Sequence, residues 1–281
     1  MAGSVNRGAG SAGGGMNIVL KLGSPCPERD FDAALRRLRG VARSVEWAAG
    51  DAVVADEPDV ALAAAGDGCH VLLHDLEPDH VAAVEQACGL AGTTFMPAHA
   101  WRFRPSVREV IRSHRAGELG VPGLVRIHRW SGEASSGIRA AAIVPEIDVI
   151  LGVFGASEES VHAVSRGDDF LQVHLGFADG GMALADFAWG VPGSYRSLCL
   201  IGSTGAAYAD DHHNMNLLLA AGFVRAINVG QGAIEVHGLL AEFVEAVREG
   251  REPAVTAVDT RSAFATARAA VNAARVAGEV R

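Results

Sequence analysis

The sequence is poorest in lysine. Of its 24 basic residues, Lys21 is the only lysine, so any site that needs a lysine elsewhere in the chain is excluded. Acidic residues outnumber basic ones by 33 to 24, which leaves a formal net charge of −9 over 281 residues. Because a nucleic-acid groove needs clustered Lys and Arg, this balance argues against nucleic acid as a partner.

Long apolar runs and paired cysteines are also missing. No run reaches the roughly 18–20 apolar residues that a membrane-spanning helix needs, so we expect no membrane partner. The four cysteines show no CxxC spacing, and we therefore expect free thiols and a cytoplasmic protein. Residues 210–214 (DDHHN) have ligand types for a divalent metal, but neighbouring side chains of an extended chain point to opposite faces. We predict a polar turn there and no metal site.

The first fifteen residues, MAGSVNRGAGSAGGG, have almost no apolar content apart from Ala and Val. They lack the apolar core of a secretory signal, and we expect residues 1–15 to form a disordered tail. An equally weighted alternative is that Met16 is the true start.

Residues 16–103 alternate between strand and helix patterns. Strand patterns occupy about 17–22, 42–47, 51–58, 69–75 and 93–103, and helix patterns lie between them at 27–40, 59–68 and 77–92. This alternation implies a parallel sheet with helices on its faces. The segment before residue 51 is short, so about one strand–helix unit is expected to be abbreviated. We predict an α/β, Rossmann-like domain over 16–103.

Residues 104–281 change character. Helix patterns at 104–120 and 143–155 flank a long strand at 123–132, and successive strand patterns then fill 158–228. Two helices, at 236–249 and 259–277, finish the chain. Strands joined by short turns predict an α+β domain with one large, mostly antiparallel open sheet. An open sheet with an apolar free face needs a partner, so we expect a dimer.

Five segments, in the same order, resemble the Gfo/Idh/MocA oxidoreductases, the glucose–fructose oxidoreductase and inositol dehydrogenase group. They are 51–75, 99–130, 146–155, 200–211 and 243–270, which together run from about residue 51 to the end. The resemblance implies a Rossmann domain, a second domain whose open sheet mediates oligomerisation, and NAD or NADP bound between them. It also implies a small polar or sugar-like ligand in an interdomain cleft.

The phosphate loop departs from that family. Its members open with strand–GxGxxG–helix, where the glycines let the backbone approach the pyrophosphate. The corresponding run here is LGSPCPERD (22–30), in which only Gly23 is kept, while Pro25 and Pro27 remove backbone donors. Glu28 and Asp30 place negative charge where phosphates would bind. NAD(P) binding is therefore in doubt, although the helix N-terminus alone remains an alternative phosphate site.

Three residues remain as weak candidates for cofactor binding. Gly23 and Ser24 follow the first strand, and Glu46 lies near the end of the second, where an acidic residue would bind the ribose hydroxyls. Asp51 is an alternative ribose ligand.

The family's catalytic lysine follows the fourth strand, where this chain has His74 and Asp75. Lys21 lies in the first strand and cannot replace it. His74 and Asp75 are candidates for proton transfer, since His titrates near neutrality. The alternative is that both are only polar residues at a strand end.

The second-domain motif of the family, D-x-G-x-H-x-x-D, is also changed. Ala141 and Pro145 replace its first Asp and its His, while Asp148 is retained and Glu146 lies beside it. We predict His99, Asp148 and Glu146 as acid–base groups. Asp148 has a structural alternative, as a bridge or cap at the domain junction.

Two residues beside His99 are predicted to bind substrate. Arg102 matches the family's arginine, and Trp101 precedes it. A structural anchor is an equal alternative for Arg102.

Three functions follow as hypotheses. The first is a dehydrogenase that has kept NAD(P) and oxidises or reduces a small polar or sugar-like metabolite, for which the missing loop and lysine are obstacles. The second is a cofactor-independent acid–base enzyme, such as a lyase, isomerase or cyclase. The third is a non-catalytic subunit whose open sheet pairs with an active paralogue. The resemblance favours a protein with impaired or lost nicotinamide chemistry.

Overall fold

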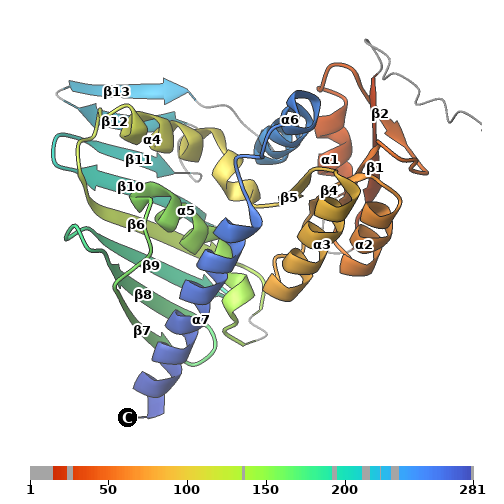
Figure 1. Ribbon diagram of the computed structural model, residues 1–281. Helices are drawn as coiled ribbons and strands as arrows, with labels where there is room; N and C mark the ends of the chain where they lie inside the picture. Colours follow the sequence, from red (N-terminus) through yellow and green to blue (C-terminus); the bar gives the residue numbers. More distant parts are fainter. Residues whose placement is uncertain are drawn as a thin grey trace, which may run out of the picture.

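Two β-sheets, each with helices packed against it, make up the molecule (Figure 1). The computed structural model describes residues 15–23, 28–134, 137–191, 195–210, 216–221, 223–228 and 234–279. Residues 1–14 of the predicted tail, Ser24 and residues 211–214 of the DDHHN run lie outside these ranges.

The first sheet is parallel, with strand order β2-β1-β3-β4-β5. Its strands are β1 (Met16–Lys21), β2 (Val41–Ser44), β3 (Ala52–Ala55), β4 (His70–Leu73) and β5 (Phe95–Pro97). The prediction of an abbreviated unit is confirmed, because residues 45–51 join β2 to β3 without a helix. The expected strand over 93–103 is wrong in its second half. There, short-range backbone hydrogen bonds turn the chain into the 3-10 helix η1 (Ala100–Phe103).

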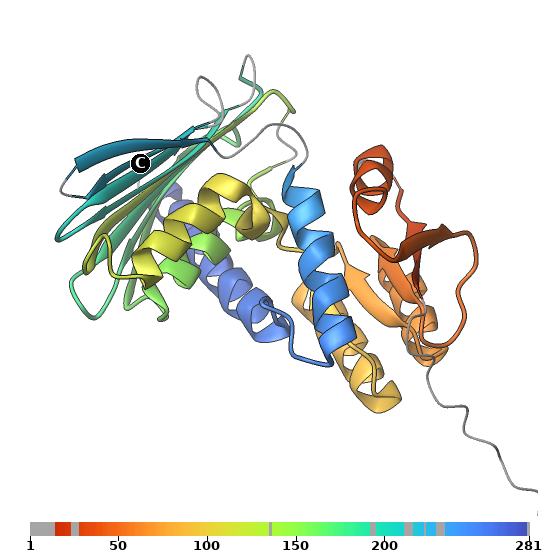
Figure 2. The same cartoon turned by 90° about the horizontal axis from the view of Figure 1, so that it is seen from above.

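Helices cover both faces of the first sheet. The helices α2 (Pro58–Gly66) and α3 (Pro78–Ala91) pack on one face through Ala and Val side chains. The other face is covered by α1 (Glu28–Leu35) and by α6 (Ile234–Glu249), which comes from the far end of the chain. Figure 2 shows α6 lying between this sheet and the rest of the molecule. The domain boundary at residue 103 stays a prediction, and α6 contributes to the core on the N-terminal side of it.

The second sheet is large and mostly antiparallel, with strand order β13-β12-β11-β10-β6-β9-β8-β7. Among the described strands of this second sheet, only the pair β6–β9 is parallel. The strands are β6 (Pro122–Ser131), β7 (Ser160–Arg166), β8 (Phe170–Gly176), β9 (Met182–Trp189), β10 (Tyr195–Gly202), β11 (Ala206–Asp210), β12 (Asn216–Ala221) and β13 (Phe223–Asn228). The predicted fold class is confirmed.

One face of the second sheet is packed against helices. These are α4 (Pro105–Arg115), α5 (Val144–Phe154) and α7 (Ala257–Glu279), with the short 3-10 helix η2 (Ala140–Ala142) at one end (Figure 1). Alternate residues of each strand, such as Val125 and Ile127, point into this core and are fully buried.

The opposite face of the second sheet is open. Alternation along the paired strands places on it six of the eleven exposed large hydrophobic side chains in the described part of the chain: Trp130, Val164, Phe170, Met182, Ile201 and Tyr208. A groove of about 640 Å³ crosses this face and is lined in part by Trp130, Val164 and Phe170. We call this surface the open face. Within the described residues, no helix is both long and apolar enough to cross a membrane.

Candidate functional site

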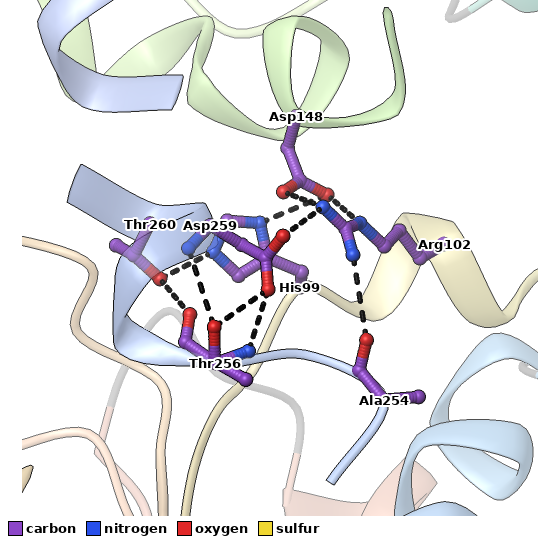
Figure 3. Close-up of polar contacts among 7 residues, drawn as sticks. All are labelled: His99, Arg102, Asp148, Ala254, Thr256, Asp259 and Thr260. Carbon is purple, nitrogen blue, oxygen red and sulfur yellow. Dashed lines mark hydrogen bonds and ion pairs between the residues drawn. The ribbon is translucent and has the colours of Figure 1, made fainter. Parts of the chain in front are cut away.

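Three of the predicted site residues, His99, Arg102 and Asp148, meet in one buried cluster (Figure 3). Asp148 extends from α5, and Arg102 from η1 holds it with two parallel hydrogen bonds, Nε to Oδ2 at 2.5 Å and Nη2 to Oδ1 at 2.7 Å. Such bidentate pairs are among the strongest polar contacts in proteins. Asp148 is 1% exposed, so this contact is almost completely shielded from water.

His99 lies on the other side of the same carboxylate. Its Nδ1 is 3.1 Å from Oδ2 of Asp148, but the angle between the two groups is not that of a hydrogen bond. The contact is therefore mainly electrostatic. Its Nε2 is 2.8 Å from Oγ1 of Thr260 at the start of α7. His99 is also 1% exposed. A ligand in solvent has no route to either ring nitrogen in this conformation.

The beginning of α7 completes the cluster. Thr256 and Asp259 form a capping box, in which the Thr256 backbone N–H donates to Oδ2 of Asp259 at 2.8 Å. The other oxygen of Asp259 accepts a hydrogen bond from Nη2 of Arg102 at 3.1 Å. Arg102 therefore joins η1, α5 and α7, and we name His99, Arg102, Asp148, Asp259 and Thr260 the junction cluster.

The charged groups of the junction cluster shift one another's pKa values. Burial acts to raise the pKa of Asp148, but the electrostatic contacts with His99 and Arg102 and the hydrogen bonds from Arg102 outweigh it and hold that pKa below its ordinary value. For Arg102, burial acts to lower the pKa, and the carboxylates of Asp148 and Asp259 overcome it and raise the pKa. This arrangement is suited to holding three elements together. The predicted catalytic roles of His99 and Asp148 remain predictions, as does substrate binding by Arg102.

Glu146 lies apart from this cluster, near the N-terminus of α5. It is fully buried, and its Oε1 accepts a hydrogen bond from Arg196 of β10 and lies 3.6 Å from Nε of Arg129 on β6. Arg196 in turn stacks over Trp101, with 4.7 Å between its Cζ and the ring centroid. Trp101 itself is 3% exposed. Glu146 thus anchors two arginines that face each other on neighbouring strands, and its acid–base role is an untested prediction, as is substrate binding by Trp101.

His74 is the most exposed of the predicted acid–base residues. It follows β4 at the carboxyl edge of the first sheet and is exposed. Desolvation lowers its pKa, and the charges of Asp56 and Asp75 act in the opposite direction. Asp75 is engaged locally, since it accepts the Glu77 backbone N–H at 2.9 Å and lies 2.5 Å from Nδ1 of His80. His74 is therefore better placed than Asp75 for proton transfer.

Two of the three weak cofactor candidates, Gly23 and Glu46, lie at the same edge. Gly23 follows β1, and its backbone N–H donates to Oδ2 of Asp56 at 2.6 Å. Glu46 is exposed beyond the end of β2, where its carbonyl accepts a hydrogen bond from Ser44. Asp51, the alternative ribose ligand, accepts the Ala48 N–H at 2.9 Å and closes a local turn.

NAD(P) binding in a Rossmann fold needs free backbone donors at the first turn and little negative charge there. Neither condition is met at Gly23, because a carboxylate already accepts its N–H. Glu28, expected to repel phosphate, is paired instead with Arg43. Asp56 is the stronger obstacle, and the described residues at this edge do not fit a pyrophosphate.

Several residues of these clusters were missed at the sequence level. Asp56, Asp259, Arg129 and Arg196 were not predicted as site residues. For Asp259 a signal existed, because Thr256 and Asp259 have the spacing of a capping box before a helix. The role of Asp56 depends on a contact across 33 residues, for which local patterns give no signal.

Comparison with known proteins gives the fold an independent basis. No protein-family model matches the chain, and no curated protein does. Among solved structures, a putative myo-inositol dehydrogenase from Sinorhizobium meliloti 1021 is similar, with 19% identity, a TM-score of 0.76 and coverage of 95% of this chain and 98% of that one. A dehydrogenase from Chromobacterium violaceum is 16% identical, with a TM-score of 0.78 and coverage of 95% and 97%.

A third similar structure contains a nicotinamide cofactor. It is an oxidoreductase from Agrobacterium radiobacter in complex with NAD+, L-tartaric acid and magnesium, 13% identical, with a TM-score of 0.75 and coverage of 92% of this chain and 96% of that one. These likenesses extend over nearly the whole of each protein. They confirm the expected architecture: the chain has the two-domain fold of the Gfo/Idh/MocA oxidoreductases.

Proposed function

We propose that this protein is an oxidoreductase-fold protein that binds a small polar or sugar-like metabolite but has lost ordinary hydride transfer with NAD(P). The observation that carries the proposal is the contact between Asp56 and the Gly23 N–H. The carboxylate oxygen of Asp56 accepts from the backbone donor that a phosphate oxygen would otherwise use. A second anion at the same donor would be repelled. Where the resembled family has its catalytic lysine, this chain has His74. The usual proton donor is therefore replaced, which supports the same conclusion.

Titration with NADH and NADPH tests this proposal directly. We expect no change in nicotinamide fluorescence up to millimolar cofactor, and none in the melting temperature of the protein. Saturable binding at micromolar concentration, by either measurement, would contradict it. Because both readouts report binding alone, the outcome does not depend on knowing the substrate.

A second candidate function is acid–base chemistry without a cofactor, with His74 as the proton acceptor. His74 is exposed, and its lowered pKa keeps its imidazole neutral at pH 7, as a general base requires. Native mass spectrometry of the purified protein would identify a co-purifying metabolite. Turnover of that metabolite by wild type but not by His74→Gln, with unchanged binding, is the expected result. Equal turnover by both would rule out His74.

The open face supports a proposal about partners. Its exposed aromatic and aliphatic side chains are grouped on one face and are not scattered singly over the surface. Grouped apolar side chains of this kind mark interaction sites. We propose that it binds a second copy of the chain, and an active paralogue is the alternative partner.

A further inference from the structure

Four arginines line one pocket between α4, α6 and the segment before α7. They are Arg102, Arg108, Arg112 and Arg115, and the pocket has a volume of about 340 Å³. This volume lies within the range of pockets that bind small molecules. Such a concentration is unusual in a chain whose net charge is −9. We call it the arginine pocket.

Helix geometry explains why three of these arginines face the same way. Arg108, Arg112 and Arg115 follow an i, i+4, i+7 spacing on α4, which aligns side chains along one stripe of a helix. Val107 and Val110, on the other side, are buried in the core. The fold of α4 therefore presents a row of guanidinium groups to the pocket.

Not all of these charges are compensated. Arg112 is bound to Glu109 by two hydrogen bonds of 2.8 and 2.6 Å, and Arg102 is bound to Asp148. Arg108 and Arg115, by contrast, have no ion pair or hydrogen bond with any residue that the structure describes. Two cations of one pocket thus have no counterion at ion-pair distance among the described residues.

The acidic residue of the pocket, Glu242, does not supply that counterion. Both of its oxygens accept hydrogen bonds from Arg251, at 2.6 and 3.1 Å, and Oε1 also accepts the Ala254 N–H at 2.8 Å. Burial acts to raise the pKa of Glu242, but these contacts, with the charge of Arg108, lower it. Glu242 is therefore ionised, and both of its oxygens are engaged by Arg251, which also pairs with Glu249.

Arg102 also has donor capacity directed away from the junction cluster. A guanidinium has five N–H donors. Nε and Nη2 bind the two aspartates, while the only described partner of Nη1 is the carbonyl of Ala254 at 3.5 Å. Since Arg102 is only 13% exposed, this donor is held in position by the cluster rather than free in solvent.

Apolar side chains form another part of the pocket wall. They are Phe103, which is 6% exposed, and Ile111, which is half-buried. Contact with these groups favours a ligand that carries an apolar portion beside its charge. An inorganic ion would make no apolar contact with this wall.

We propose that the arginine pocket is a second ligand site, which binds a small organic anion. Its phosphate or carboxylate group lies among Arg102, Arg108 and Arg115, and its apolar part packs on Phe103 and Ile111. A neighbouring cavity of about 360 Å³ shares Arg102 and Arg115. It is less suited to an anion, because Asp259 and the C-terminal end of α5 line it.

Calorimetric titration of the full chain at low ionic strength tests the site. The probes are phenyl phosphate, benzoate, inorganic phosphate and, as a neutral probe, benzyl alcohol. We expect phenyl phosphate or benzoate to bind more tightly than inorganic phosphate, and benzyl alcohol not to bind. The preferred aromatic anion distinguishes a phosphate site from a carboxylate site. Absence of binding by both aromatic anions at millimolar concentration would overturn the proposal.

Charge-matched variants locate the binding. Arg108→Gln and Arg115→Gln should each weaken the aromatic anion by about tenfold, equivalent to about 1.4 kcal/mol. Arg275→Gln, an exposed change near the end of α7, should leave it unchanged. An equal loss in all three variants would show only non-specific attraction and would also overturn the proposal. These outcomes are independent of the nicotinamide titration, which concerns Gly23 and Asp56, neither of which lines the arginine pocket.

Discussion

A single carboxylate, Asp148, contacts both His99 and Arg102 in the buried junction between η1 and α5. Removing one member of a buried ion pair leaves the other charge without compensation, which costs more than the pair itself contributes. The role of this residue in stability is therefore open to measurement, whatever its role in chemistry.

We predict that Asp148→Asn lowers the free energy of unfolding at pH 7 by about 3–5 kcal/mol, measured by urea denaturation. Glu85→Gln, which removes an exposed pair with Arg261 at 2.9 Å, is the control and should cost at most about 1 kcal/mol. Similar losses in both variants would contradict a special role for Asp148.

The free energies of unfolding of wild type and Asp148→Asn should also differ in how they depend on pH. Because the pKa of Asp148 is lowered on folding, its contribution is complete above the unfolded value of about 3.9 and is lost as the pH falls through the folded value. The stability difference between wild type and Asp148→Asn should therefore be constant near neutrality and shrink in acid, below about pH 4. A difference that grows in acid would contradict this assignment.

Asp56 provides a test of what prevents nicotinamide binding. Asp56→Ala frees the Gly23 N–H and removes one negative charge, so we expect NADH affinity to rise by about tenfold or more relative to wild type. Asp59→Ala, an exposed change on α2 that alters the net charge equally, is the matched control. If neither variant gains affinity, the replaced glycine loop is the obstacle and Asp56 is not.

At the scale of elements, the turn after β10 and the segment that leads into β6 lie against each other at very short range. Gly202 at the end of β10 lies against the chain that enters β6, where a Cβ on Gly202 would be 2.0 Å from the carbonyl oxygen of Leu119. The segment is also tied by the Ser203 N–H, which donates to the carbonyl of Val121 at 2.9 Å. Backbone atoms cannot yield as a flexible side chain does.

We predict that Gly202→Ala lowers the free energy of unfolding by about 1–3 kcal/mol, as overpacked sites do. Gly89→Ala on α3 is the control, because a Cβ there meets nothing within 4 Å and Ala is the better helix former. The control should be neutral or more stable in thermal unfolding. Equal melting temperatures for the two variants would contradict the close crossing.

The elements that could be predicted are those whose sequence pattern lies within a few neighbouring residues. The apolar periodicity of α5 and α7 and the alternation in β8 and β9 are visible in a few neighbouring residues, and these elements were predicted correctly. The turn into η1 was missed because residues 98–103 are apolar enough to resemble a strand. The junction cluster was found only in part, since Arg102 meets Asp259 across 157 residues.

At the scale of the whole molecule, the open face is the largest apolar surface we describe. We predict a homodimer, which Phe170→Glu should convert to monomer in size-exclusion chromatography with light scattering. Phe170 is 46% exposed on this face, whereas Leu90, 85% exposed on α3, lies outside it. Leu90→Glu should therefore leave the dimer intact. A monomeric wild type would contradict self-association and favour a different partner.

The position of α6 has a consequence for biosynthesis. Its side chains Leu239, Leu240 and Phe243 are fully buried against the sheet formed by residues 16–97. That sheet cannot cover one of its faces until residue 249 has left the ribosome, because the helix that completes it is made last but one. During translation, the first strands must therefore remain exposed or be shielded by a chaperone for most of the time that the chain is being made.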